Sequence, residues 1–452
     1  MSVKALAWTS VPVAVGIALV HNALAVSLSL AVLAYYATYS FIPLVSDVFI
    51  KHGRFGKDRL KKDFPVVAES MGLIAGCVYL GVMFLFIPVP FVPFFRQQTD
   101  VSGTSGLDFF GVPMFPHETL GQYLAGLLSL FSMLFLGFVD DVVDIKWRVK
   151  IWMPLVACIP LLMVYMVTYN VTHIVVPIPF RGLFGLEKLV DLGILYYGYM
   201  AALCIFATNA INIIAGMNGV EGIQCLVIGS ALLINSLYQV AITTYQSTKE
   251  AHLIAVYFLL PFLGVTIGYL RHNWYPSKCF GGDTYVYFAG MTFAVAGILG
   301  RFTKTVLLFM VPQIFNFLYS CPQLFGFVEC PRHRMPQLNS ETGNVEQTRV
   351  SLEKTKPLGK AMIRILEVLY LVDVERDPKT NKMISCNNLT LINLLLVKFG
   401  PTTEANATLR VGYTQLVFCL LGFCARYGLA FLFYRQDYQQ GSTTETVRQN
   451  EL

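Results

Sequence analysis

The sequence is poor in charge for its length of 452 residues, because Asp, Glu, Lys and Arg together make up only 13% of it. A typical soluble protein carries about 25% charged residues. Hydrophobic residues make up 55% of the chain, and its mean hydropathy is +0.60. A soluble globular protein is excluded, since it would lack the polar surface it needs, and 34 Phe with 23 Tyr exclude intrinsic disorder. The composition therefore predicts an integral membrane protein.

Sequence motifs of several common catalytic sites are also absent. The chain has no Walker A loop, no HExxH and no GxSxG motif, and it lacks the Asp-Gly-x₂-Ala-Arg pattern of CDP-alcohol phosphotransferases. Its ten cysteines form no CxxC pair and no disulfide framework. Cys330 and His333 alone supply too few ligands for a zinc site. We therefore expect ordinary free thiols.

Long apolar segments take up most of the chain, and about twenty apolar residues are enough to cross a bilayer as a helix. Ten such segments predict an all-α polytopic membrane protein with about ten transmembrane helices in the lipid bilayer and no nucleic-acid partner. The predicted spans lie near Val11–Val45, Val66–Ile87, Leu120–Val139, Ile151–Tyr169, Leu192–Ala215, Ile223–Thr243, His252–Leu270, Thr284–Leu299, Thr305–Phe327 and Val411–Phe433.

Lysine and arginine are distributed unevenly between the two sides of the membrane, which predicts the orientation of the chain. The short loops 42–65, 140–150 and 271–283 carry 11 of these residues, whereas all segments on the opposite side together carry nine. We therefore expect those loops to be cytoplasmic and both termini to face away from the cytosol. The sequon at Asn170 then falls on the lumenal side, so we expect a glycan on Asn170 or on none, and never on Asn388.

One substantial soluble segment interrupts the pattern of spans. We expect residues 1–327 to form nine transmembrane helices and residues 328–400 to form a small mixed α/β insertion on the cytoplasmic face. Residues 401–452 are predicted to hold the last transmembrane helix and a lumenal tail.

The strongest local signal is the run GFVDDVVD at residues 137–144, at the cytoplasmic end of the third predicted span. On a helix Asp140 and Asp144 share a face, with Asp141 beside them. Such carboxylates repel one another unless a cation lies between them, and Mg²⁺ with a diphosphate is a typical occupant. The alternative is a solvated charge cluster that pairs with nearby lysines.

Polar side chains lie at two further cytoplasmic span ends. Asn209 and Asn212 share a helix face, where an amide oxygen can bind a metal ion, although an amide contact between helices is the alternative. Asp283 follows two glycines and should reach the same membrane face as Asp140, although a helix N-cap is its simpler explanation. Phe280 offers a ring on which a nucleotide base can stack.

The sequence Cys-Pro-Arg-His-Arg opens the large insertion. Arg332 and Arg334 flank His333, and guanidinium groups match phosphate oxygens, so this segment predicts a diphosphate clamp. A simple positive-inside cluster is the alternative. A transporter would place its ionisable groups at mid-span and show inverted repeats, whereas here these groups gather at one membrane face. An enzyme at the cytoplasmic face is therefore favoured.

Together these clusters resemble the polyprenyl-phosphate N-acetylhexosamine-1-phosphate transferase family. The resemblance runs from Gly56 to about Phe433 and is densest at LGFVDDVVDIKWR, TNAINIIAGMNGVEG, GDTYVYFAGMTFAVAGILG and CPRHR. CPRHR resembles the eukaryotic branch. The resemblance implies Mg²⁺-dependent transfer of GlcNAc-1-phosphate from UDP-GlcNAc to dolichyl phosphate at the cytosolic face of the endoplasmic reticulum membrane. A related enzyme that uses another UDP-sugar is the alternative, and a homodimer is left open.

The resemblance also implies roles for individual residues. Asp140 and Asp141 would be the catalytic carboxylates, and Asn212 and Asp283 would bind Mg²⁺. The dolichyl phosphate would meet Lys150 and the stretch Ile205, Phe206, Ala207, Thr208, Asn209, Ala210, Ile211, Asn212 and Ile213. The nucleotide would be held by Lys57, Asp58, Arg59, Glu69 and Asn218. The sugar phosphate would be held by Arg332, His333 and Arg334.

Overall fold

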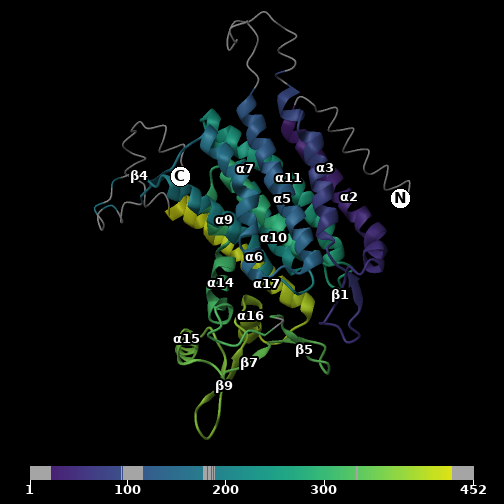
Figure 1. The fold of residues 1–452 in the computed structure, drawn as a ribbon, viewed down its shortest axis with the longest axis vertical. Helices are drawn as coiled ribbons and strands as arrows, with labels where there is room; N and C mark the ends of the chain where they lie inside the picture. Colours follow the sequence, from purple (N-terminus) through teal and green to yellow (C-terminus); the bar gives the residue numbers. More distant parts are fainter. Residues whose placement is uncertain are drawn as a thin grey trace, which may run out of the picture.

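The computed structural model of the chain describes residues 22–92, 94, 116–176, 181, 185, 187, 189–331 and 334–429. Helices dominate it (Figure 1). They are α2 (Ala23–Lys51), α3 (Gly72–Phe86), α5 (His117–Val143), α6 (Trp147–Lys150), α7 (Met153–Thr168), α9 (Ile194–Ile213), α10 (Val220–Ile242), α11 (Gln246–Asn273), α12 (Gly282–Leu299), α13 (Thr303–Phe309), α14 (Val311–Leu324), α15 (Pro357–Val368), α16 (Leu391–Phe399) and α17 (Glu404–Phe423). The strands are β1 (Phe55–Lys57), β2 (Val66–Ala68), β3 (His173–Val175), β4 (Leu189–Asp191), β5 (Gln337–Leu338), β6 (Val345–Glu346), β7 (Arg349–Ser351), β8 (Val374–Arg376) and β9 (Met383–Asn387).

Eight helices of the described residues are long and apolar enough to cross a membrane. The pair α13 and α14, bent by 66° at its break, raises this number to nine if it counts as one span. The remaining predicted span is α12, which is helical as expected but is not among these nine. The prediction of a mostly helical, multi-pass membrane protein is confirmed.

Two predicted spans differ from the observed helices for identifiable reasons. The span expected from Val66 begins only at Gly72, because Val66–Ala68 forms β2 and pairs antiparallel with β1. The last span before the insertion bends at Met310, where Pro312 in the first turn of α14 has no N–H to continue the α13 ladder. Residues before 22, where the first span was expected to begin, lie outside the described part.

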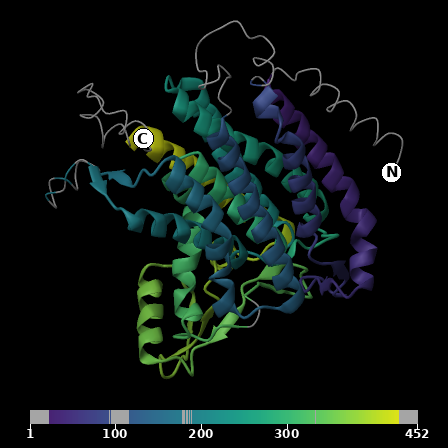
Figure 2. The ribbon, with the colours of Figure 1, turned by 45° about the horizontal axis from the view of Figure 1, so that its top comes forward.

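Most of the segments predicted on one side of the membrane lie at one end of the bundle. The β1–β2 hairpin and residues 328–400 occupy this end, whereas the β3–β4 hairpin lies toward the other (Figures 1 and 2). Residues 328–400 contain α15, α16, the β5–β6 pair and a three-stranded sheet of order β7-β9-β8. The expected mixed α/β character of this insertion is confirmed. All ten cysteines are free.

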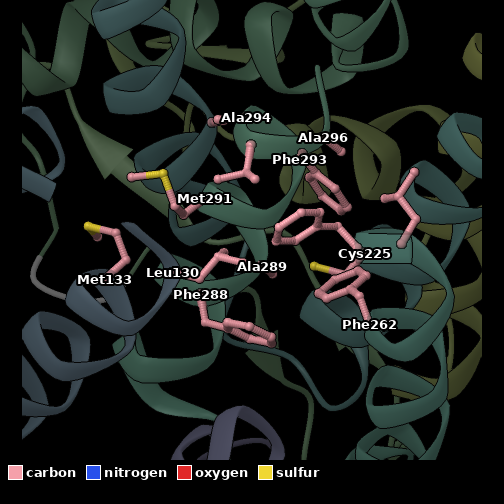
Figure 3. Close-up of a cluster of buried hydrophobic side chains, with 14 of the residues drawn as sticks. Leu130, Met133, Cys225, Phe262, Phe288, Ala289, Met291, Phe293, Ala294 and Ala296 are labelled. Atoms are coloured by element: carbon pink, nitrogen blue, oxygen red, sulfur yellow. The ribbon is translucent and has the colours of Figure 1, made fainter. Parts of the chain in front are cut away.

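Helix α12 forms the centre of the bundle. All its residues from Thr284 to Leu299 are buried, and it packs against α5, α9, α11 and α3. Figure 3 shows part of the resulting apolar core, in which Phe288 and Met291 of α12 lie near Leu130 of α5 and Phe262 of α11. Because α12 begins at Gly282, its packing fixes where Asp283 lies.

A glycine sets the separation of α9 and α12. A Cβ atom on Gly290 would lie 2.4 Å from the carbonyl oxygen of Ala207 and 2.5 Å from the Cα of Thr208. Both are backbone atoms that a small side-chain movement cannot relieve, so Gly290→Ala should push the two helices apart and lower the unfolding free energy by about 1–3 kcal/mol. Thermal unfolding of the purified protein measures this loss. Gly198→Ala on α9 is the matched control, because a Cβ there meets nothing within 4 Å; an equal loss in both variants would contradict the packing argument.

Candidate active site

A cleft of about 530 Å³ lies at the end of the bundle that carries the insertion. It is lined by residues from the β1–β2 hairpin, the C-terminal end of α5, α6, the ends of α9 and α10, and the start of α12. It brings together most of the residues predicted from the sequence: Lys57, Asp58, Arg59, Glu69, Asp140, Asp141, Lys150, Asn212, Asn218, Phe280 and Asp283. These residues are separated by up to 226 positions in the sequence, so the fold alone collects them.

Lys150 connects two carboxylates at the centre of the cleft. Its Nζ lies 2.9 Å from Oδ2 of Asp140 and 2.8 Å from Oδ2 of Asp283. The other oxygen of Asp283 accepts a hydrogen bond of 2.8 Å from the side-chain amide of Asn212. Asp140 is 2% exposed and also accepts hydrogen bonds from the Tyr287 hydroxyl and the Ile145 N–H. The lysine thus lies between two negative charges that would otherwise repel each other.

Asp141 has a different environment from its neighbour. Its Oδ1 accepts a hydrogen bond of 2.6 Å from the backbone N–H of Asp283, and its Oδ2 accepts from the N–H and the hydroxyl of Thr284. These N–H groups lie in the first turn of α12, where no carbonyl group of the same helix can accept their hydrogen bonds. Asp141 therefore caps α12 and fixes the backbone of Asp283.

The prediction that Asp144 shares a helix face with Asp140 is wrong. Helix α5 ends at Val143, and Asp144 adopts a left-handed conformation with φ of 52°. Aspartate tolerates this conformation better than most residues, which makes it a suitable helix terminator. Asp144 still lines the cleft, but it lies beyond the end of α5 and its side chain is exposed.

One wall of the cleft is built by backbone pairing. The N–H of Phe280 donates to the carbonyl of Ala68, and the N–H of Met71 donates back to the carbonyl of Phe280. This holds the Phe280 ring next to Gly56, where a Cβ would lie 3.0 Å from it, and near Glu69. Burial raises the pKa of Glu69, and the negative charge of Asp283 acts in the same direction while Arg54 opposes it. A cation bound near Asp283 would therefore help to keep Glu69 ionised.

A buried network that the sequence did not reveal connects residues that were predicted to bind the nucleotide. The side-chain amide of Asn218 donates a hydrogen bond of 3.0 Å to the Asp58 carboxylate. The backbone N–H of Asn218 donates a hydrogen bond of 2.9 Å to Glu404 at the start of α17. Lys61 forms ion pairs with both Asp58 and Glu404. Glu404 lies 186 positions from Asn218, and nothing in the local sequence around it pointed to this contact.

A second cavity of about 370 Å³ adjoins the cleft and shares Lys150 and Asn212 with it. Its lining adds Asn209, Ile213, Tyr287, Leu324 and Arg334. The other residues predicted to meet dolichyl phosphate do not line it: Ala207, Thr208, Ala210 and Ile211 are buried within the bundle, because successive residues of a helix face different directions, and Ile205 and Phe206 are half-buried.

The predicted diphosphate clamp is described only in part, because Arg332 and His333 lie outside the described residues. Arg334 lines the second cavity, where its guanidinium donates to the side chain of Gln323 and to the carbonyl of Leu389. These contacts hold the Arg334 guanidinium against the end of α14 and the segment before α16.

The donor set of the cleft suits a hard divalent cation that is completed by substrate. In the described residues no three His, Cys, Asp or Glu side chains form a metal cage. Asp283, with its side chain 22% exposed, and the adjacent Asn212 offer one carboxylate and one amide oxygen. Mg²⁺ characteristically binds to one or two such groups and to phosphate oxygens.

Tyr287 is a site residue that the sequence analysis did not name. It follows Asp283 by one helical turn on α12, and its hydroxyl donates 2.9 Å to Oδ2 of Asp140. The i, i+4 spacing could have indicated it.

The structure combines a bundle of membrane-crossing helices, a charged cleft at one membrane face and a second cavity beside the apolar helix α9. These features define a polytopic membrane enzyme that joins a polar substrate to a lipid one. Residues 123–301 match the Glycosyl transferase family 4. The chain belongs to this family, and its similarity to individual members extends over almost its whole length.

Two fungal relatives carry the same name. The UDP-N-acetylglucosamine--dolichyl-phosphate N-acetylglucosaminephosphotransferase of Schizosaccharomyces pombe is 45% identical over 94% of this chain and 97% of its own length. The protein of that name from Saccharomyces cerevisiae is 42% identical over 92% of this chain and 94% of its own. The phospho-N-acetylmuramoyl-pentapeptide-transferase of Borrelia hermsii is 32% identical over 42% of this chain and 55% of its own length.

Proposed function

We propose that this chain transfers GlcNAc-1-phosphate from UDP-GlcNAc to dolichyl phosphate, giving GlcNAc-diphosphodolichol and UMP. The observation that carries the proposal is Lys150, which contacts Asp140 and Asp283 where the two cavities join. One cavity is lined by charged and polar groups and suits a nucleotide sugar, whereas the other adjoins α9 and suits a lipid phosphate. The two fungal relatives bear the name of this activity.

The larger cavity binds UDP-GlcNAc in this proposal. The Phe280 ring stacks on the uracil, and Asn218 and Glu69 hydrogen-bond to the nucleoside. Asp58 holds Asn218 in place. The exposed cations Lys57 and Arg59 at the rim attract the anionic donor. Arg332, His333 and Arg334 bind the sugar phosphate.

The smaller cavity receives the phosphate of the lipid acceptor. Lys150 attracts it electrostatically, and Asn209 and Ile213 of α9 lie beside its path. The polyprenyl tail remains in the bilayer because it is apolar. The acceptor oxygen thereby comes close to the phosphorus that is bonded to the sugar.

Asn212 and Asp283 would hold Mg²⁺. When bound, the ion supplies positive charge that stabilises the phosphate groups as UMP leaves. Asp141 contributes by capping α12, which fixes the Asp283 backbone.

The acceptor phosphate oxygen attacks the β-phosphorus of UDP-GlcNAc, and the bond to the α-phosphate oxygen breaks with release of UMP. Asp140 accepts the last proton of the acceptor phosphate if it is still present. Both oxygens of Asp140 are hydrogen-bonded and the residue is 2% exposed, which disfavours a covalent phosphoryl-Asp140 intermediate. Direct displacement is thus favoured over a route through Asp140.

The decisive assay follows UMP release by the purified protein. UMP should form only when UDP-GlcNAc, dolichyl phosphate and Mg²⁺ are all present, and a lipid-linked GlcNAc-diphosphate should appear in equal amount. Formation of product from UDP-GalNAc or UDP-N-acetylmuramoyl-pentapeptide at a higher kcat/KM would instead assign the chain to another donor. Release of UMP without lipid acceptor would contradict transfer.

The site lies on the cytosolic face of the endoplasmic reticulum membrane in this proposal, with both termini in the lumen. The charge distribution over the loops supports it. Asn388 is fully buried in the insertion, whereas Asn170, on the opposite side of the membrane, is exposed. The side-chain oxygen of Asn170 accepts a hydrogen bond from the Tyr197 hydroxyl.

This topology predicts where a glycan is attached. Endoglycosidase should reduce the mass of the protein from eukaryotic cells, and Asn170→Gln should remove this sensitivity. Occupancy should be partial, because Asn170 follows the end of α7 closely. Asn388→Gln serves as the control and should change nothing. A glycan on Asn388 would place the insertion in the lumen and refute the orientation.

A further inference from the structure

Helix α15 of the insertion has an exposed apolar face. Leu358, Ile365 and Leu369 recur at helical spacing along one side of the helix and are 57%, 61% and 58% exposed. Val368 extends this face at 76% exposure, and Tyr370, which follows the end of the helix, is 77% exposed. The opposite side of α15 packs into the insertion through Gly359 and Ile363, so the exposed residues are not needed for its core.

The exposed face is bordered by cations. Lys354, Lys356, Lys360 and Arg364 fall between Glu353 and Glu367, with no acidic residue among them. Glu367 is itself paired with Arg376, at 2.6 Å. An amphipathic helix with cations along an apolar face is the pattern of helices that lie in the headgroup region of a membrane.

Contacts attach α15 to α14, which together with α13 forms a candidate membrane span. The hydroxyl of Tyr319, in the middle of α14, donates 2.7 Å to the carbonyl of Leu371, just beyond α15. Leu324 at the end of α14 lines the same cavity as Lys150, where the lipid phosphate would bind. Tyr319 also packs into the core of the insertion, so the C-terminal end of α15 is held against a helix whose end reaches this cavity.

Figures 1 and 2 show α15 beside the lower part of α14, outside the bundle of long helices. The exposed Leu318 and Phe325 of α14 add apolar surface near it.

We propose that the face of α15 formed by Leu358, Ile365, Val368, Leu369 and Tyr370 inserts into the headgroup region of the leaflet at the active-site end and prefers anionic lipids through its cations. This inference does not require the transferase activity, because it rests on the helix and its position relative to α14. The favoured occupant is the bilayer that already holds the protein, since α15 is tethered next to it and matches its charge.

The test uses p-benzoylphenylalanine in place of Val368 or Tyr370, with the full chain in nanodiscs of phosphatidylcholine and a minority of phosphatidylserine. Irradiation should give covalent lipid adducts at both positions, detected by mass spectrometry of the peptides. Phosphatidylserine should be enriched in the adducts at least about fivefold over its share, as expected for a few cations close to anionic headgroups.

Two matched variants complete the test. The same photoreactive residue at Lys379, in the exposed turn between β8 and β9, should give no lipid adduct. Lys356→Gln, Lys360→Gln and Arg364→Gln together should leave the adduct at Tyr370 but abolish the phosphatidylserine enrichment. The proposal is overturned if neither Val368 nor Tyr370 gives lipid adducts, if Lys379 gives as much, or if both positions crosslink to a protein instead.

Discussion

Replacing Asp283 by Asn is expected to lower turnover by about a thousandfold or more, because it removes the only carboxylate of the proposed Mg²⁺ pair while keeping its shape. The structure adds a second reason, since Oδ2 of Asp283 also forms the 2.8 Å ion pair with Lys150. UMP release at saturating Mg²⁺ and at saturating concentrations of both substrates is the measurement. Binding of UDP without metal should be retained, because Asp283 lies on the side of the cleft that we propose for the metal rather than for the nucleoside.

The matched control is Asp144→Asn. Asp144 lines the same cleft, but its side chain is exposed and its left-handed backbone suits Asn equally well. Its turnover should stay within a few-fold of the wild type. Near-normal turnover of Asp283→Asn under the same conditions would refute its assignment as a metal ligand, whereas equal losses in both variants would indicate a general effect of carboxylate removal.

Replacing Lys150 by Met should be about as damaging, for a different reason. It removes the cation between Asp140 and Asp283 and leaves two carboxylates facing each other in a partly buried site, where breaking one ion pair costs about 3–5 kcal/mol. The proposed role toward the lipid phosphate predicts a sharp fall in use of dolichyl phosphate, with affinity for UDP-GlcNAc changed much less. Steady-state kinetics with each substrate varied in turn measure the two effects.

Lys146→Met is the control for this variant, because Lys146 is an exposed lysine on the same short segment between α5 and α7. Its kinetics should remain close to those of the wild type. If Lys150→Met weakened UDP-GlcNAc binding as much as it weakened use of the lipid, the division of the site into a donor cavity and an acceptor cavity would be wrong.

The sequence predicted the carboxylates and the amide at the centre of the site because each lies at the end of a long apolar segment. A polar group there must either function or find a partner, so Asp140, Asn212 and Asp283 stood out. It could not predict that Asp144 leaves the helix, because three nearby aspartates fit a helix face as well as a helix end. Nor could it separate Asp141 from Asp140, whose different partners on α12 appear only in three dimensions.

The sequence could not predict most of the contacts between segments that lie far apart in the chain. Glu404 opens α17 and reads locally as a favourable acid in a first helical turn, yet its side chain accepts from the N–H of Asn218. Similarly, Val66–Ala68 continues an apolar run and resembles a helix, but pairing with β1 makes it a strand. In both cases the tertiary partner outweighs the local preference.

The complete burial of α12 has a consequence for how activity develops during synthesis. The segment from Thr284 to Leu299 is apolar enough to enter the bilayer, but it becomes buried on all sides only when α3, α5, α9 and α11 pack around it. Since α12 begins with Gly282 and Asp283, the contacts of Lys150 with Asp140 and Asp283 form only when the bundle closes. A variant that fails to assemble the bundle is therefore expected to lose the proposed catalytic centre as a whole.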